Sequence, residues 1–310
     1  SQLVGTVLLA ESQRLTLKTL RLQQQDLAWE NAAPIEIVRS PQGALQIQRL
    51  HLRSGAQTVH LQGTLNPQGA VQATVQVQAL QLQPTARVFA PDLSLPDGRL
   101  DLALTLSGSW QQPQMQVTLQ LTALQWQNRQ LGTMQATVGL SGTTVHTDLR
   151  WQSQGHEIVQ VRGTMRLDGA KPLDMQIQAP MVDLATLGPL TPAVTQSAGA
   201  LSLDLRVTGT LQQPQASGHF ALRDGVVQLA TTGQRYHGIQ ARVTLTSDRV
   251  TIEQLQIESR GGPLQVTGWL TYTGLTPRQV DLTVQAQDFT AMHTADIQAR
   301  VSTQVTVRGI

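Results

Sequence analysis

The stretch from Gly98 to Gly108 reads Gly-Arg-Leu-Asp-Leu-Ala-Leu-Thr-Leu-Ser-Gly, with a leucine at every second position between Leu100 and Leu106. Successive side chains of a strand point to opposite faces, so this segment has one apolar and one polar face. The same alternation recurs along most of the chain, and turn sequences such as Asn66-Pro67-Gln68-Gly69 separate the segments at hairpin spacing. We therefore predict an all-β protein, an antiparallel meander of roughly 18–20 strands.

The composition argues against several classes of protein. Of 310 residues, 14% are charged, 3% are aromatic and none is cysteine. A disulfide framework, a thiolate metal site and a cysteine nucleophile are thus excluded. The formal charge is only +2 and the arginines are scattered, whereas nucleic-acid binders cluster basic residues, so we expect no nucleic-acid partner. So few aromatic residues also disfavour a transmembrane barrel, which needs two aromatic girdles.

The chain ends and the possible reactive groups complete this survey. No stretch approaches the roughly 18 apolar residues of a membrane helix, and Val305–Ile310 still follow the strand pattern, so we expect both ends to be cuts in a longer protein. No histidine pair, nucleophile elbow or phosphate loop has the spacing of a known catalytic or metal motif. We expect no enzyme activity and no cofactor. The tryptophans are expected at the rim or in the groove of the sheet: Trp29, Trp110, Trp126, Trp151 and Trp269.

An internal repeat of about 100 residues divides the chain. Gly98–Gln114 and Gly199–Gln215 are identical at nine of seventeen positions, and a third copy runs from about Ala299 to Gly309. We expect three repeats, at 1–108, 109–208 and 209–310, within one continuous structural unit. Three segments interrupt the strand pattern, each long enough for one or two helical turns: Pro84–Pro91, Met181–Val194 and Asp288–Ala295.

Two features indicate that the strands are bent. Strict alternation would place one polar residue between successive apolar residues, but two stand between Ile47 and Leu50, and two between Ile252 and Leu255. One extra residue in one strand is typical of a β-bulge. The strand glycines Gly63, Gly163 and Gly268 are also consistent with curvature. We predict an elongated, curled antiparallel sheet with a few short helical inserts and an open apolar concave face. The alternative is a second sheet or a closed solenoid interior covering that face.

An open apolar face predicts an apolar ligand. A diacyl lipid carries about 30 methylenes, and their exposure to water costs more than about 20 kcal/mol at roughly 0.8 kcal/mol each. An apolar groove would offset much of that penalty. The residues predicted to line it are Leu102, Leu104, Val117, Leu119, Leu203, Leu205, Val243, Leu245, Ile252, Val266, Leu282 and Val284.

The order of glycines and prolines adds a resemblance. Leu95-Pro-Asp-Gly98, Leu222-Arg-Asp-Gly225 and the stretch Ser259–Gly268 follow one another in a pattern that resembles the repeat of the TamB family, AsmA-like proteins of Gram-negative bacteria. The resemblance spans essentially the whole chain. It implies a taco-shaped β-groove in the periplasm that moves phospholipid between the inner and outer membranes. It also implies an inner-membrane anchor, missing here, and an outer-membrane barrel partner like TamA.

Two other functions remain open. The first is an assembly factor or chaperone, whose exposed sheet edges pair with unfolded strands of outer-membrane proteins. The second is an extracellular adhesin or closed β-solenoid with a dry interior.

Overall fold

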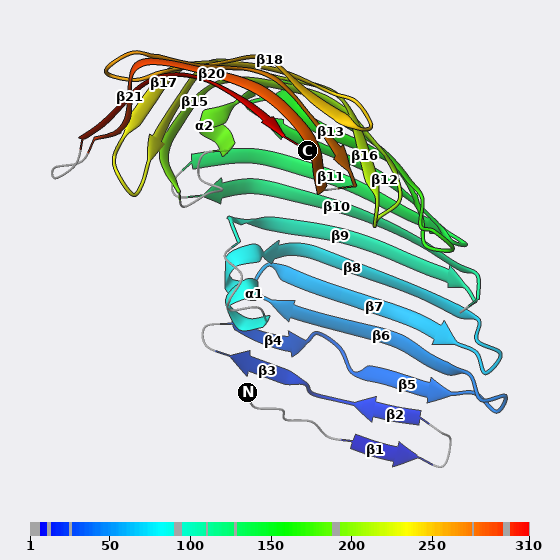
Figure 1. Ribbon diagram of the computed structural model, residues 1–310. Helices are drawn as coiled ribbons and strands as arrows, with labels where there is room; N and C mark the ends of the chain where they lie inside the picture. The colour runs from blue at the N-terminus through cyan, green and yellow to red at the C-terminus, as the bar shows by residue number, and fades with distance from the viewer. Residues whose placement is uncertain are drawn as a thin grey trace. The chain divides into compact units, whose positions relative to one another are not determined.

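The computed structural model describes residues 7–10, 14–24, 27–89, 95–109, 111–126, 129–187, 193–274, 276–293 and 298–309. These residues form 21 strands and two short helices (Figure 1). The predicted all-β class with a few short helices is confirmed. Contacts divide the chain into two compact units, Ser1–Gly155 and His156–Ile310, which are described separately below.

The first unit is a sheet whose later strands follow a simple meander. From β5 to β12 each strand pairs antiparallel with the next. The earlier strands depart from this order, because β2 pairs with β5 while β4 pairs with the other half of β6. The elements are β1 (Val7–Ala10), β2 (Arg14–Leu17), β3 (Arg21–Gln24), β4 (Leu27–Asn31), β5 (Ile35–Arg39), β6 (Leu45–Ser54), β7 (Gln57–Leu65), β8 (Val71–Gln81), α1 (Leu82–Phe89), β9 (Asp97–Gly108), β10 (Pro113–Trp126), β11 (Arg129–Ser141) and β12 (Thr144–Ser153).

The second unit is an uninterrupted antiparallel meander, in which every strand pairs with its neighbour in the chain. The elements are β13 (His156–Arg166), β14 (Leu173–Asp183), α2 (Leu184–Leu187), β15 (Val194–Gly209), β16 (Pro214–Leu229), β17 (Arg235–Leu245), β18 (Arg249–Glu258), β19 (Pro263–Thr273), β20 (Thr276–His293) and β21 (Gln298–Gly309). Both units are open, uncurled sheets, so the predicted curl is wrong. The bulges bend single strands and do not roll up the sheet.

The sequence repeat maps onto equivalent strands. Its three copies lie on β9, β15 and β21, and both β9 and β15 turn through Gln-Gln-Pro into their partner strands, β10 and β16. The repeat boundaries after residues 108 and 208 fall at or next to the ends of β9 and β15. The boundary between the compact units, after Gly155, falls elsewhere.

The two helices lie in the first two of the predicted interruptions. The third interruption, Asp288–Ala295, behaves differently, because its described residues continue β20 as far as His293. Asp288 has a φ of 46°, and its backbone N–H donates to the Ser302 hydroxyl of β21. Pairing with β21 thus satisfies backbone groups that a helical turn would otherwise satisfy. The expected helical turn is therefore not formed there.

The predicted bulges are present. The register shifts between Ile47 and Leu50 in the β6–β7 pair and between Ile252 and Leu255 in the β18–β19 pair. The residue directly opposite Ile47 is Gly63, and the residue opposite Ile252 is Gly268, so these two strand glycines stand beside bulges. Gly163 does not, because it lies opposite Met175 in a β13–β14 pair without a register shift. A bulge adds its extra residue to one strand only, so the bending that it causes is local to that strand.

Other bulges were not predicted. Four register shifts contain a residue other than glycine with a positive φ of 46–53°: Ala79, Ala123, Asp224 and Asp288. A left-handed conformation is unfavourable for such residues, so the surrounding pairing must hold it in place.

Several of the most deeply buried residues lie next to these bulges. Leu124 directly follows Ala123 and is 2% exposed, and Phe289 directly follows Asp288 and is 8% exposed. Val182, 1% exposed, follows a further register shift in β14. The buried apolar residues of the described chain are Leu27, Trp29, Ile35, Ala86, Leu124 and Leu131 in the first unit, and Ile158, Ala179, Val182, Ile239, Ala241, Ala286 and Phe289 in the second.

The bulge at Ala123 gives a first prediction. Ala123→Gly should raise the free energy of unfolding by about 0.5 kcal/mol. Glycine relieves a left-handed strain of about 1–2 kcal/mol, and the greater entropy of glycine in the unfolded chain cancels part of that gain. Ala123→Val should lower it by about 1–2 kcal/mol, since a β-branched side chain fits this conformation worst. Urea unfolding measures both.

Ala103→Val is the matched control, because Ala103 is an exposed β9 residue outside the positive-φ set. This change should leave stability unaltered within about 0.5 kcal/mol. Equal effects of valine at positions 103 and 123 would show that the bulge carries no strain.

Candidate functional site

Cross-strand register in the first unit aligns apolar side chains in rows. Directly opposite residues of an antiparallel pair share a face. Leu102 of β9 lies opposite Leu119 of β10, and Leu104 lies opposite Val117. The four groove residues predicted in this unit therefore lie on one face. Their two rows continue over β6 to β12 through Leu52, Val59, Val77, Leu102, Leu119, Ala136 and Leu149, and through Leu50, Leu61, Val75, Leu104, Val117, Val138 and Thr147.

The second unit has equivalent rows. One runs across six strands from β15 to β20, through Leu203, Phe220, Val243, Ile252, Gly268 and Leu282. The adjacent row, on β15 to β17, contains Leu205, Gly218 and Leu245. The bulge after Ile252 restores Leu255 to the same face, opposite Val266, which in turn lies opposite Val284. All eight groove residues predicted in this unit therefore share one face.

The exposure of these side chains separates them from the core. All twelve predicted residues are half-buried, and none belongs to the buried set. A leucine packed beneath a second layer would be almost fully buried. Among the described residues, the only helices are α1, which contacts β8 and β9, and α2, which contacts β14 and β15. Most of each apolar face is therefore left without a helical layer.

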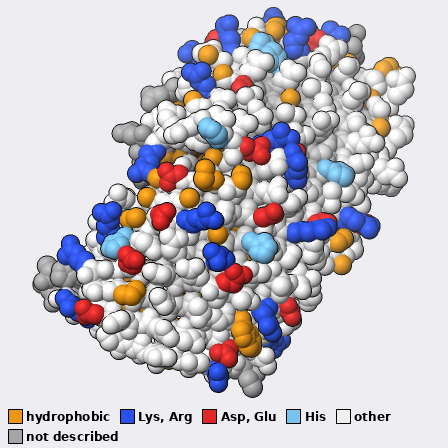
Figure 2. Space-filling model, turned by 90° about the horizontal axis from the view of Figure 1, so that it is seen from above, with side chains coloured by type: hydrophobic (Ala, Val, Ile, Leu, Met, Phe, Trp, Pro, Cys, Tyr) orange, Lys and Arg blue, Asp and Glu red, His pale blue; other side chains and the backbone are white. Residues whose placement is uncertain are grey.

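The opposite face is polar. In β10 the glutamines and threonine that alternate with the row residues are exposed. Ion pairs also lie there, such as Arg206–Asp174 with Nη2 and Oδ2 2.7 Å apart. The hydrogen bond from the Arg206 guanidinium lowers the pKa of the Asp174 carboxyl. Figure 2 shows a face on which charges of both signs are interspersed and hydrophobic side chains form small patches.

The tryptophans do not all lie at the rim or in the groove of the sheet, as was expected. Trp151 lies on the apolar face opposite Met134, and its indole N–H donates to the Leu131 carbonyl at 2.7 Å. Trp29 is a buried core residue. Trp269 lies on the polar face opposite Asp281 and Thr251, with the Arg249 guanidinium 4.6 Å from its ring centroid. Rim or groove placement is therefore wrong for Trp29 and Trp269. Trp126 is half-buried in β10, and Trp110 lies outside the described residues.

The row residues were found by alternation, but the bulges that bury the core were not. The signal was present in the sequence. Two residues, Thr122 and Ala123, separate Leu121 from Leu124 where one is expected, as two residues separate Ile47 from Leu50. Extending that count to small residues would have located the core band.

The described residues hold no group of three or more His, Asp or Glu side chains that could bind a metal ion. No helix within the described ranges is long and apolar enough to cross a membrane. Comparison with known proteins found no matching family model, no matching curated protein and no matching solved structure. The functional argument therefore depends on the geometry of the two apolar faces.

The contrast between core and face can be tested by truncation. Leu124→Ala should lower the free energy of unfolding by about 3 kcal/mol, because it leaves a cavity at a fully buried site. Leu104→Ala should lower it by only about 1 kcal/mol, because water or a ligand already reaches that half-buried side chain. Chemical denaturation of both variants provides the comparison. Equal losses would show that the face is packed as tightly as the core.

Proposed function

We propose that the apolar faces shield the acyl chains of phospholipids during their transfer between the two membranes of a Gram-negative envelope. The observation that carries the proposal is the set of rows of half-exposed leucine, valine and isoleucine, each crossing several consecutive strands. Exposed apolar patches of this extent are unusual on soluble proteins and mark binding surfaces.

The dimensions of a row suit an acyl chain. The row from Leu203 to Leu282 crosses six strands, and five inter-strand steps of about 4.8 Å span about 24 Å. The hydrocarbon core of a bilayer is about 30 Å thick, so one acyl chain extends about 15 Å. A chain laid along this row would therefore remain against apolar side chains over its whole length.

The chemistry of the row supports the same ligand. Between Leu203 and Leu282 the row contains no ionisable or hydrogen-bonding side chain. A methylene removed from water there gains up to about 0.8 kcal/mol, whereas a polar ligand would find no partner for its hydrogen bonds. The surface thus selects hydrocarbon by its shape and apolarity. It carries out no chemical step, and we propose a non-enzymatic role.

The resemblance to the TamB repeat supports the remaining parts of the proposal. They are a periplasmic location, attachment to the inner membrane in the full-length protein, and an outer-membrane barrel of the TamA kind as partner. These parts depend on glycine and proline positions such as Leu95–Gly98 and Ser259–Gly268 rather than on the apolar rows.

A charge placed in the row tests lipid binding. Leu203→Glu and Leu282→Glu should each reduce binding of a fluorescent phospholipid at least tenfold, because an ionised carboxylate would have to lose its water against the acyl chain. Both sites are half-exposed, so circular dichroism should show an intact sheet. Ser202→Glu is the matched control, since Ser202 lies on the polar face opposite Ala221. Unchanged lipid binding by both row variants would refute the proposal.

Mass spectrometry of the purified chain tests the same proposal without a probe. Phospholipid should be recovered from protein expressed in a Gram-negative host, and recovery should fall in Leu203→Glu relative to Ser202→Glu. Protein free of lipid, with an apolar face inaccessible to added acyl chains, would instead favour a closed, dry interior.

A further inference from the structure

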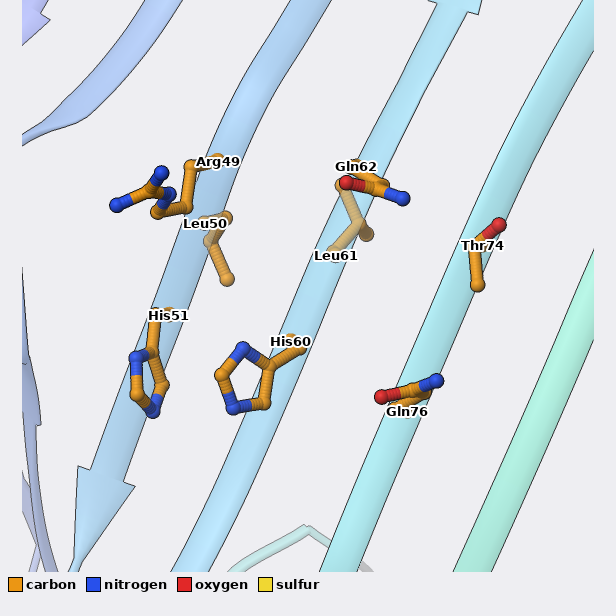
Figure 3. Close-up of a pocket in the computed structure, with 8 residues that line it drawn as sticks. All are labelled: Arg49, Leu50, His51, His60, Leu61, Gln62, Thr74 and Gln76. Atoms are coloured by element: carbon orange, nitrogen blue, oxygen red, sulfur yellow. The ribbon is translucent and has the colours of Figure 1, made fainter.

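The polar face of the first unit contains a depression of about 320 Å³ over β6, β7 and β8 (Figure 3). Each strand contributes two polar side chains that alternate with the apolar row residues on the other face. The lining residues are Arg49 and His51 from β6, His60 and Gln62 from β7, and Thr74 and Gln76 from β8, together with Leu50 and Leu61. A cavity of this size accommodates a small polar ligand.

The bulge after Ile47 places Arg49 in the depression. Gln48 and Arg49 occupy the extra positions between Ile47 and Leu50, opposite Gln62. Arg49 is exposed, and no ion pair joins it to a carboxylate within the described ranges. Its guanidinium is therefore a free cation with several N–H donors at the side of the cavity.

The two histidines form the centre of the depression. His51 and His60 are directly opposite in the β6–β7 register, and their rings stack with centroids 3.7 Å apart. Figure 3 shows the two imidazoles side by side, with Gln76 beside His60 on the next strand and Arg49 further along the strand of His51. His51 Nε2 is buried and has no hydrogen-bond partner. A buried polar atom without a protein partner is rare and is commonly satisfied by a bound water or ion.

The only permanent charge in the lining of the cavity is positive. None of the eight lining residues is acidic, and Arg49 is the one arginine among them. Beyond the lining, Glu30 on β4 is held by Arg53, with Oε1 and Nη2 2.9 Å apart. Glu36 on β5 is directly opposite Arg49 and lies 3.8 Å from Arg14. The charged groups near the histidines are thus Arg49, Arg53, Glu30 and Glu36, and β8 contributes none. A lining whose one permanent charge is a guanidinium disfavours a metal cation and favours an anion.

We propose that this depression binds an oxyanion of the phosphate or sulfate class, including the phosphate of an organic headgroup. Arg49 supplies the permanent charge, and Gln62, Thr74 and Gln76 supply neutral hydrogen-bond donors. His51, stacked on the ring of His60, adds charge when it is protonated, and a bound anion favours that protonated form.

The direction of the pH dependence follows from His51. Burial lowers its pKa below the ordinary value, and the neighbouring His60, Arg53 and Arg49 lower it further. His51 therefore takes up its proton at a lower pH than an ordinary histidine does. Anion binding should accordingly tighten as the pH falls.

Sulfate is the suitable probe, because its charge is constant between pH 5.5 and 7.5. Titration of the full chain, followed by the His51 and His60 resonances in NMR spectra, should show saturable binding at least fivefold tighter at pH 5.5 than at pH 7.5. Arg49→Gln should weaken binding at least fivefold at both pH values. His51→Gln should abolish most of the pH dependence. Arg206→Gln, which removes a polar-face arginine already paired with Asp174, should change neither.

Two further binding measurements distinguish a lipid headgroup from a free anion as the ligand. Phosphatidylcholine vesicles containing phosphatidylglycerol should bind in an Arg49-dependent manner if the ligand is a lipid headgroup, and inorganic phosphate alone should bind if it is a free anion. Either result supports the site. Absence of saturable sulfate binding at pH 5.5 would overturn the proposed anion site. So would the finding that the histidine pair binds Zn²⁺ more tightly in Arg49→Gln and that no anion binds. All these readouts concern the polar face, so they remain separate from the acyl-chain tests at Leu203.

Discussion

Backbone pairing in a fixed register is the constraint on which both faces of each sheet depend. Side chains alternate with period two, so a slip of one residue in any strand would exchange its apolar and polar faces. The rows through Leu104 and Leu203 exist because successive ladders keep leucine opposite valine, phenylalanine or leucine over several strands. Where a strand carries an odd number of extra residues, a bulge absorbs them, as between Ile252 and Leu255. The same mechanism keeps the apolar face continuous and directs Arg49 onto the polar face.

Stability and ligand binding are assigned to different residues of the same strand. The buried side chains gather beside the bulges, as Leu124 does after Ala123, and the rows a few residues away remain half-exposed. Core packing and the hydrogen-bond ladder therefore hold the sheet, and the rows are not needed to fill a core. This division explains how a chain with 3% aromatic residues forms a regular sheet and still leaves apolar surface available.

Alternation in the sequence was sufficient to predict the fold class, the meander from β13 to β21, the bulges at Ile47 and Ile252, and which residues share a face. These are consequences of local periodicity. Prediction failed where pairing overrides local pattern. Asp288 continues a strand because β21 supplies its hydrogen-bond partner, and that strand lies fourteen residues along the chain. Trp269 is apolar in composition but lies on the polar face, because the glycine before it occupies the row position.

The histidine pair was recognisable in principle. The β6–β7 hairpin pairs Ser54 with Gln57, and counting back three residues on each side places His51 opposite His60. Motif searches overlook such a pair, because the two residues are nine positions apart and share no short spacing. Nothing in the sequence, however, fixes the ring stacking or the unpaired Nε2 of His51, which depend on the side chains packed around them.

The meander order of the second unit has a consequence for how it is synthesised and folded. Every strand from β13 to β21 pairs only with strands adjacent to it in the chain, so its contacts are close in sequence and loop closure costs little entropy. Each hairpin can therefore form as soon as its second strand leaves the ribosome and then act as a template for the next. A protein of this kind grows strand by strand during translation, without waiting for a distant segment to complete its core.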